Sequence, residues 1–390
     1  MRNIRLAIYY QENGKSKTSL GGDEMKKYLA LFMGMIMSAT IAQAAQAAPN
    51  NIPTITIGWA NELHTGNAQL TKMIPEVFAD NPVHLKPISS SQFELIKDGE
   101  VIAYVNHVQT KGAAESATLM SQGHMQMAYC SSTALITAYD AGTDVKILCP
   151  IQSDGVAIAA SIRQPYNTFE ELVAYAKKAN RPVVAGYHSA VSSPRIVLEY
   201  ALKDAGLKVT ENPADYSADV LMIDLKGLAN LVPSLASGQA DLWAGPAPNP
   251  QNAVAMGVGK IIATLNDLPD GKWVNFPCCT FNVLQSTIDQ YPEIVAAMAQ
   301  VTYDIMDYAQ NHKDEIAPYM SQFVGLEESV LKQHNIVYTT APDAQFVNGM
   351  ETYFDAMKGM GKITGRLADK SFDEVLNLVF DFSFINSVEK

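Results

Sequence analysis

Short apolar segments alternate with amphipathic segments along most of this chain. Runs rich in β-branched and other apolar residues predict strands at residues 55–59, 125–130, 145–148, 183–187, 220–223, 241–244 and 261–265. Apolar positions with helical spacing predict helices between them, for example over residues 169–179, 194–205 and 228–237. Because strands that alternate with helices form parallel sheets covered on both faces, we expect an α/β fold.

One unit of this pattern occurs twice, at residues 118–148 and 234–262. Both copies consist of a helix ending at Gly, a short strand, a turn of small residues or Pro, a second helix and a second strand. The repeat predicts two lobes built on the same plan. Residues 93–104 predict an additional hairpin with Asp98-Gly99 in its turn. From Ile288 to the end the pattern is mainly helical, and we expect this region to pack on an existing lobe.

The segment 25–47 has the layout of a secretory signal peptide. Two Lys follow Met25, an apolar run comes next, and small residues precede Pro49. We expect Met25 to be the true start and residues 1–24 to be a misassigned upstream leader, with a real extended leader as the alternative. No later segment reaches the roughly 18 apolar residues of a transmembrane helix, so we expect an exported, periplasmic chain without direct membrane insertion.

Charge narrows the class of partner. The 390 residues include 28 Lys and Arg against 40 Asp and Glu, which gives a net charge of -12. An acidic chain repels the phosphates of nucleic acids and anionic membrane surfaces. We therefore exclude both as main partners and expect a small-molecule ligand.

The sequence lacks the common catalytic motifs. Its seven His residues form no His-Glu-x-x-His pair, and neither a Gly-x-Ser-x-Gly elbow nor a phosphate loop is present. We predict no catalytic residue, no cofactor and no metal site.

The four cysteines are Cys130, Cys149, Cys278 and Cys279. None has zinc-finger spacing, and vicinal cysteines bond to each other only with local strain. An exported protein is free to form disulfides. Two alternatives stay open: a bridge from Cys149 to one member of the vicinal pair, or free buried thiols.

Candidate binding residues lie where predicted strands end in small residues before a helix. Free amides in the first turn of a helix, with Ser hydroxyls beside them, bind anionic or polar groups. Aromatic side chains at strand ends can face a crevice and bind an apolar group. These patterns select Trp59, His64, Gly112, Ala113, Cys130, Ser131, Ser132, His188, Ser189, Ser192 and Trp243.

Several short motifs occur in an order that is specific although each motif is weak. They are the opening strand from Thr54 to Trp59, Ser-Gln-Gly before a short strand, residues 143–148, residues 235–241 and Pro277-Cys278-Cys279. Together they resemble the periplasmic substrate-binding proteins of ABC transporters. The relevant branch includes nitrate, taurine and aliphatic-sulfonate receptors and proteins related to pyrimidine-precursor synthesis.

The resemblance implies a two-lobed type II periplasmic-binding-protein fold with the ligand in a cleft between the lobes. Lobe 1 would comprise residues 48–150 and 277–390, with the C-terminal helices packed on it, and lobe 2 residues 151–276. The chain would cross between lobes near residues 148–154 and 276–281. These crossings would place Cys149 and Cys278 close enough for a bridge.

The resemblance also implies a receptor that delivers a solute to an ABC permease with its ATPase. The matching positions are Trp59, Asn61, Gly112, Ala113, Ser131, Ser132, Ser189, Ser192, Trp243 and Pro246. The implied ligand has a polar or anionic head at the helix amides and an apolar body against Trp59 or Trp243. The turn at Ser131-Ser132 lacks the Pro pair associated with sulfonate receptors, which counts against a sulfonate or taurine ligand.

Two alternatives to this function stay open. Cys278-Cys279 with His64 or His188 could belong to an enzyme related to the pyrimidine-precursor synthases. A receptor that feeds a sensor instead of a permease has the same sequence features.

Overall fold

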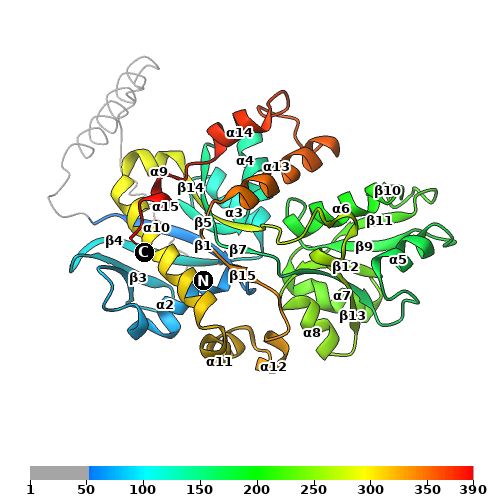
Figure 1. The fold of residues 1–390 in the computed structure, drawn as a ribbon, viewed down its shortest axis with the longest axis horizontal. Coiled ribbons are helices and arrows are strands. Elements are labelled where there is room, and N and C mark those ends of the chain that lie inside the picture. Colours follow the sequence, from blue (N-terminus) through cyan, green and yellow to red (C-terminus); the bar gives the residue numbers. More distant parts are fainter. Residues whose placement is uncertain (1–51, 390) are drawn as a thin grey trace, which may run out of the picture. The chain divides into compact units, whose positions relative to one another are not determined.

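A computed structural model describes residues 52–389 of the chain. The predictions for the leader and the signal peptide, residues 1–47, lie outside the described residues. Most strands form two separate sheets, drawn mainly in blue to cyan and in green in Figure 1.

The first sheet has seven strands. Their order across the sheet is β2 (Val83–Pro87), β3 (Gln92–Lys97), β4 (Glu100–Thr110), β1 (Thr54–Ala60), β5 (Met127–Ser131), β14 (Cys279–Leu284) and β6 (Val145–Pro150). Strands β4, β1 and β5 are parallel, and β14 runs antiparallel to both of its neighbours. The predicted hairpin is present as β3 and β4, with Asp98 and Gly99 in the left-handed backbone region.

The second sheet has six strands. Their order is β10 (Val209–Thr210), β11 (Val220–Asp224), β9 (Val183–Tyr187), β12 (Leu242–Pro246), β8 (Val156–Ser161) and β13 (Gly259–Thr264). Here β10, β11, β9 and β12 are parallel, whereas β8 runs antiparallel to both β12 and β13. A small ladder joins β7 (Gln152–Ser153) to β15 (Val337–Tyr338).

Both sheets are therefore mixed, which corrects the expectation of parallel sheets. The repeated unit supplies β5 and β6 to one sheet and β12 and β13 to the other, and each pair is separated by one antiparallel strand. That strand, β14 or β8, is the first strand after the chain has crossed from the other sheet. The parallel strands end at the edge where the crossings occur, so a strand that enters from there runs in the opposite direction.

Helices connect and cover the strands. The α-helices are α2 (Leu70–Met73), α3 (Ala113–Ser121), α4 (Ser132–Asp140), α5 (Phe169–Ala176), α6 (Ser193–Asp204), α7 (Leu231–Ser237), α8 (Asn249–Ala255), α9 (Gln285–Gln290), α10 (Pro292–Asn311), α11 (Lys313–Val324), α12 (Glu328–Leu331), α13 (Ala344–Gly359), α14 (Phe372–Val379) and α15 (Ser383–Asn386). Short 3-10 turns occur at Gly66–Gln69, Pro75–Val77, Leu228–Asn230, Leu265–Asp267 and Pro269–Gly271.

The C-terminal helices pack mainly on the first sheet, as expected. Helix α10 contacts β2, while α14 and α15 contact β6. Two helices of this region also contact helices that cover the second sheet: α13 contacts α6, and α12 contacts α8. The C-terminal region thus contributes to holding the two sheets together.

The two crossing segments lie side by side. Ser153 forms a β-bridge with Pro277, and the Asp154 amide donates a hydrogen bond to the Phe276 carbonyl at 2.9 Å. The Gly155 amide donates to the side chain of Asn335 at 3.1 Å, which ties a third segment to the same place. The connection between the sheets is therefore made of three paired chain segments.

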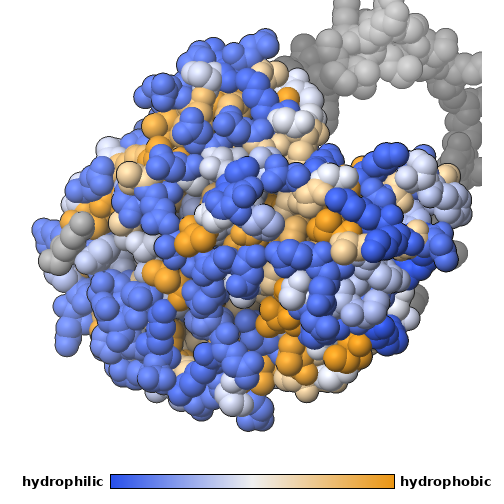
Figure 2. Space-filling view, turned by 45° about the vertical axis from the view of Figure 1, so that its right-hand side comes forward, coloured by the Kyte–Doolittle hydropathy of each residue, from blue (hydrophilic) through white to orange (hydrophobic). Residues whose placement is uncertain are grey.

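On the face shown in Figure 2, small groups of hydrophobic side chains are interrupted by polar ones. Within residues 52–389, no helix is both long and apolar enough to cross a membrane.

Candidate functional site

A cavity with about 380 Å³ of empty volume, open solvent included, lies where strands of both sheets end. The first sheet and the segments that follow its strands contribute Ala60, Glu62, His64, Thr65, Thr110, Gly112, Ala113, Ser116, Tyr129, Cys130 and Ser131. Residues 151–276 contribute His188, Pro194, Leu228 and Pro246, and the second crossing leads into Cys278 and Cys279. The wall combines apolar surface with hydroxyl, imidazole and thiol groups, and none of its residues is Lys or Arg.

Seven of the predicted binding residues line this cavity. They are His64, Gly112, Ala113, Cys130, Ser131, His188 and Pro246. They come from five different segments of the chain, so only the tertiary fold brings them together. Gly112 has a φ of +142° at the start of α3, a conformation that favours glycine.

The two predicted tryptophans do not line the cavity, which corrects the expected apolar contact. Trp243 is fully buried in a core cluster with Leu231 and Leu235, because β12 lies inside its sheet. Trp59 is also buried and packs against the ring of Phe323, with 5.4 Å between the ring centroids.

The remaining predicted residues also lie outside the cavity lining. Asn61 is exposed and borders a separate hollow. Ser132 is buried, and its amide donates to the Cys278 carbonyl at 3.0 Å. Ser192 donates its hydroxyl to the Ser189 carbonyl at 3.0 Å, so this pair closes the turn before α6.

The helix start at α6 uses one of its free amides internally. Ser131 accepts a hydrogen bond from the Ser193 amide at 3.1 Å, and Thr133 donates to the Val191 carbonyl at 2.6 Å. These bonds join the turn after β5 to the turn before α6. The predicted binding turns thus contact each other directly.

The loop after β1 is organised by Glu62, which the sequence did not single out. Its carboxylate accepts hydrogen bonds from the amides of His64 and Thr65, at 2.6 and 3.0 Å, and from the Thr65 hydroxyl. Burial raises the pKa of Glu62, although the nearby His64 and these bonds act against the rise. The carboxylate fixes the loop that carries His64 into the cavity wall.

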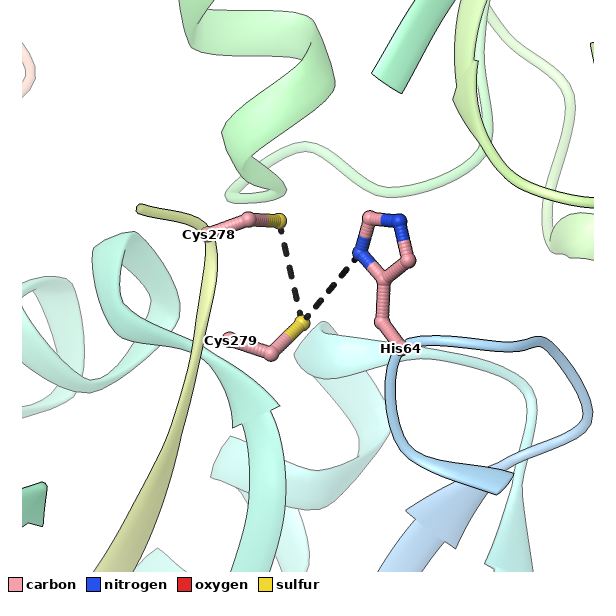
Figure 3. Close-up of side chains that lie close together, drawn as sticks. All are labelled: His64, Cys278 and Cys279. Atoms are coloured by element: carbon pink, nitrogen blue, oxygen red, sulfur yellow. Dashed lines mark hydrogen bonds between the residues drawn. The ribbon is translucent and has the colours of Figure 1, made fainter. Parts of the chain in front are cut away.

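His64, Cys278 and Cys279 form a compact cluster, which we call the thiol cluster (Figure 3). The two sulfur atoms are 3.7 Å apart, and the Cys279 sulfur is 3.9 Å from Nδ1 of His64. The imidazole is held at its other side as well, with Nε2 3.1 Å from the Gly155 carbonyl and Nδ1 2.6 Å from Nε2 of Gln152.

The cluster is electrostatically asymmetric. The hydrogen bond with Cys279 and the proximity of His64 hold the pKa of Cys278 well below its usual value, against the effect of burial. The same bond, together with burial, raises the pKa of Cys279. Burial disfavours the charged form of His64, but Cys278 and Glu62 outweigh it and raise the pKa to about 9. Cys278 is therefore the more acidic thiol of the pair.

Of the two alternatives for the cysteines, the structure shows the second: all four are free and buried, and no bridge joins Cys149 to Cys278. Cys149 lies opposite Phe281 in the ladder between β6 and β14. Cys278 precedes Phe281 by three residues, about 10 Å at the rise of a strand. This exceeds the roughly 7 Å between Cα atoms that a disulfide tolerates.

The fold is shared with solved binding proteins at low sequence identity. A zinc-bound ligand-binding component of an ABC-type import system from Staphylococcus aureus has a TM-score of 0.64 at 13% identity, covering 86% of this chain and 99% of that chain. The periplasmic nitrate-binding protein of Synechocystis gives 0.64 at 13% identity, with 86% and 88% covered. An alkanesulfonate-binding protein from Xanthomonas axonopodis, bound to MOPS, gives 0.59 at 14% identity, with 82% and 96% covered. The predicted periplasmic-binding-protein fold is confirmed.

Sequence comparison finds one relative that matches about a third of the chain and one family. An uncharacterized protein from Methanocaldococcus jannaschii is 28% identical over 134 residues, which are 33% of this chain and 92% of that protein. The model of the NMT1-like family matches residues 62–325, from the Glu62 loop through both sheets and all cavity-lining segments after Ala60. The chain belongs to the NMT1-like family.

Proposed function

We propose that this chain is an extracytoplasmic receptor that captures a small polar solute in the cavity and delivers it to an ABC-type permease with its ATPase. The observation that carries the proposal is the composition of the cavity wall, to which both sheets contribute at their strand ends. A ligand in the cavity contacts both sheets with their helices only when these two parts are close together, so binding favours the closed arrangement.

The structural relatives support the transport role. Their names describe ligand-binding components of import systems and receptors for nitrate and alkanesulfonate. Export of the chain by a signal peptide at residues 25–47 belongs to the same proposal. So do the lobe boundaries, with lobe 1 at residues 48–150 and 277–390 and lobe 2 at residues 151–276.

The cavity wall revises the expected solute. The volume that the centre of a water molecule can reach inside the cavity is about 30 Å³, which is room for about two waters, so an organic solute enters only when the two sheets with their helices move apart. No guanidinium or ammonium group lines it, so a bidentate clamp on a carboxylate or sulfonate is absent from the described wall. The polar groups of the wall are hydroxyls, imidazoles, thiols and one carboxylate, carried by Thr65, Thr110, Ser116, Tyr129, Ser131, His64, His188, Cys130, Cys278, Cys279 and Glu62.

Thermal denaturation against a panel of small solutes tests the proposal. The panel contains nitrate, bicarbonate, sulfonates, carboxylates, amino acids and pyrimidines. A solute at 100 times its dissociation constant stabilises the folded state by about 2.7 kcal/mol, which raises the Tm by a few degrees.

A cavity-filling variant links a positive result to this site. Ala113→Leu places a larger side chain in the cavity wall and should abolish the shift, whereas Ala114→Leu, on the same helix but outside the lining, should retain it. An equal shift in both variants would place the ligand elsewhere and contradict the proposal.

A further inference from the structure

The thiol cluster has the donor set of a site for a thiophilic metal ion. The two sulfur atoms and a histidine nitrogen lie within 4.8 Å of one another, and all three residues are buried. Thiolate and imidazole together select ions of the Zn²⁺ class. The vicinal cysteines supply both sulfurs from one short segment at the start of β14.

The distances within the cluster match tetrahedral coordination. With Zn–S of about 2.3 Å and Zn–N of about 2.0 Å, tetrahedral angles place two sulfurs about 3.8 Å apart and a sulfur about 3.5 Å from a nitrogen. The corresponding distances here are 3.7 Å between the sulfurs and 3.9 Å from the Cys279 sulfur to Nδ1. These two distances lie within a few tenths of an ångström of the tetrahedral values, and the remaining pair, the Cys278 sulfur and the imidazole, lies within 4.8 Å.

The imidazole is oriented as in a metal site. The Gly155 carbonyl accepts from Nε2 at 3.1 Å, which keeps the proton on Nε2 and turns the Nδ1 lone pair towards the sulfurs. Without an ion, Gln152 donates its amide to Nδ1, and its own Oε1 has no partner among the described residues. Binding of an ion to Nδ1 displaces this amide.

A fourth coordination position is available on the cavity side. The three cluster residues line the cavity together with His188, whose Nδ1 is buried and has no hydrogen-bond partner within residues 52–389. A water molecule or a donor atom of a solute can occupy that position. Sites with three protein ligands and one open position are typical of zinc centres that bind a further ligand.

We propose that Cys278, Cys279 and His64 bind an ion of the Zn²⁺ class in the cavity wall, with the fourth position open to a donor atom of the solute. The ion replaces the protons that the cluster carries, so binding releases protons and becomes tighter as the pH rises. The role of the ion in solute binding rests on the proposed receptor function, whereas the metal site itself does not.

Titration with Co²⁺ tests the metal site. The full chain, purified under reducing and anaerobic conditions and treated with a chelator, should develop thiolate-to-cobalt charge-transfer absorption that saturates at one equivalent. Zn²⁺ should displace the cobalt and abolish this absorption. Added instead to the metal-free protein in a weakly buffered solution, Zn²⁺ should release protons. A wild-type protein without the absorption at one equivalent would overturn the proposal.

Matched variants assign the ligands. Cys278→Ala and Cys279→Ala should each weaken Zn²⁺ binding at least 100-fold, and Cys149→Ala, which removes a buried thiol outside the cluster, should leave the affinity within threefold. Retained affinity in the cluster variants would refute the assignment. Should these variants not fold, alkylation of the wild-type protein decides: Zn²⁺ must protect Cys278 and Cys279 more than Cys149.

The metal site and the receptor function can fail separately. If a solute stabilises the chelator-treated protein but Co²⁺ gives no absorption, the metal-site proposal is refuted and the receptor proposal is supported. If Co²⁺ gives the absorption but no solute of the panel stabilises the protein, with or without Zn²⁺, the metal-site proposal is supported and the result counts against the receptor proposal. If the ion anchors the solute, the apparent affinity for the solute, measured from its stabilising effect, must fall at least tenfold after chelation.

Discussion

Replacing His107 by Gln should reduce the sensitivity of this protein to acid. His107 is buried on β4 against the ring of Phe93, with 4.3 Å between ring centroids, and Nδ1 is 2.8 Å from the side-chain amide of Gln69. Burial, with a smaller contribution from Lys72, lowers the pKa of His107 from 6.5 to about 3. The imidazole is therefore neutral in the folded protein over a pH range in which the same imidazole is protonated in the unfolded chain.

The sign and size of the effect follow from this difference. A depressed pKa in the folded state means that stability is complete above about pH 6.5 and is lost as the pH falls towards 3. Each pKa unit corresponds to about 1.4 kcal/mol, so His107 alone should cost about 2 kcal/mol between neutral pH and pH 5. Burial also lowers the pKa of His188 and of His334 to about 4, so the wild-type loss includes other groups.

Urea denaturation at neutral pH and near pH 5 measures the difference between variant and wild type. Gln at position 107 keeps an acceptor for Gln69 but has no titrating group, so the free energy of unfolding should fall by about 2 kcal/mol less than in the wild type. His124→Gln, at an exposed histidine, is the matched control. Equal losses in the His107 variant and the wild type would refute the reasoning.

Three further predictions concern the packing of the C-terminal region and the cavity. Asp140→Ala should lower the free energy of unfolding by about 3 kcal/mol in urea denaturation, because this carboxylate accepts hydrogen bonds from the amides of residues 364, 365 and 367; a loss below 1 kcal/mol would contradict this role. Gly365→Ala should lower the free energy of unfolding by more than about 2 kcal/mol, since its Cβ would clash with the backbone carbonyl of Asp140. Gly359→Ala, in open space at the end of α13, should be neutral or stabilise by up to about 1 kcal/mol. Ala113→Leu should remove solute-induced thermal shifts that Ala114→Leu retains.

Much of the candidate site could be anticipated from local sequence. Turns of small residues after short strands pointed to Gly112, Ala113, Cys130 and Ser131, and all four line the cavity. His64 and His188 were selected because each follows a predicted strand, and both are in the wall. These positions depend on strand ends, which hydrophobic periodicity locates well.

The errors have a common physical origin. Trp59 lies next to the end of β1, but Trp243 is the second residue of β12, which continues to Pro246. The direction of each side chain also depends on what packs on each face of the sheet. Glu62 escaped notice because a buried carboxylate that bonds to amides two and three residues ahead has no distinct sequence pattern. The disulfide considered between Cys149 and Cys278 is not formed, because the register of β14 against β6 places Cys149 beside Phe281.

Local periodicity and turn chemistry are enough to specify the alternation of strands and helices, the repeated unit and the hairpin at Asp98-Gly99. Tertiary structure decided the direction of β8 and β14, because a strand's orientation depends on where the chain enters the sheet. It also decided that His64 meets Cys278 and Cys279 across more than 200 positions of the chain. Contacts at such separation arise only when the crossing segments pair, and no local pattern specifies that pairing.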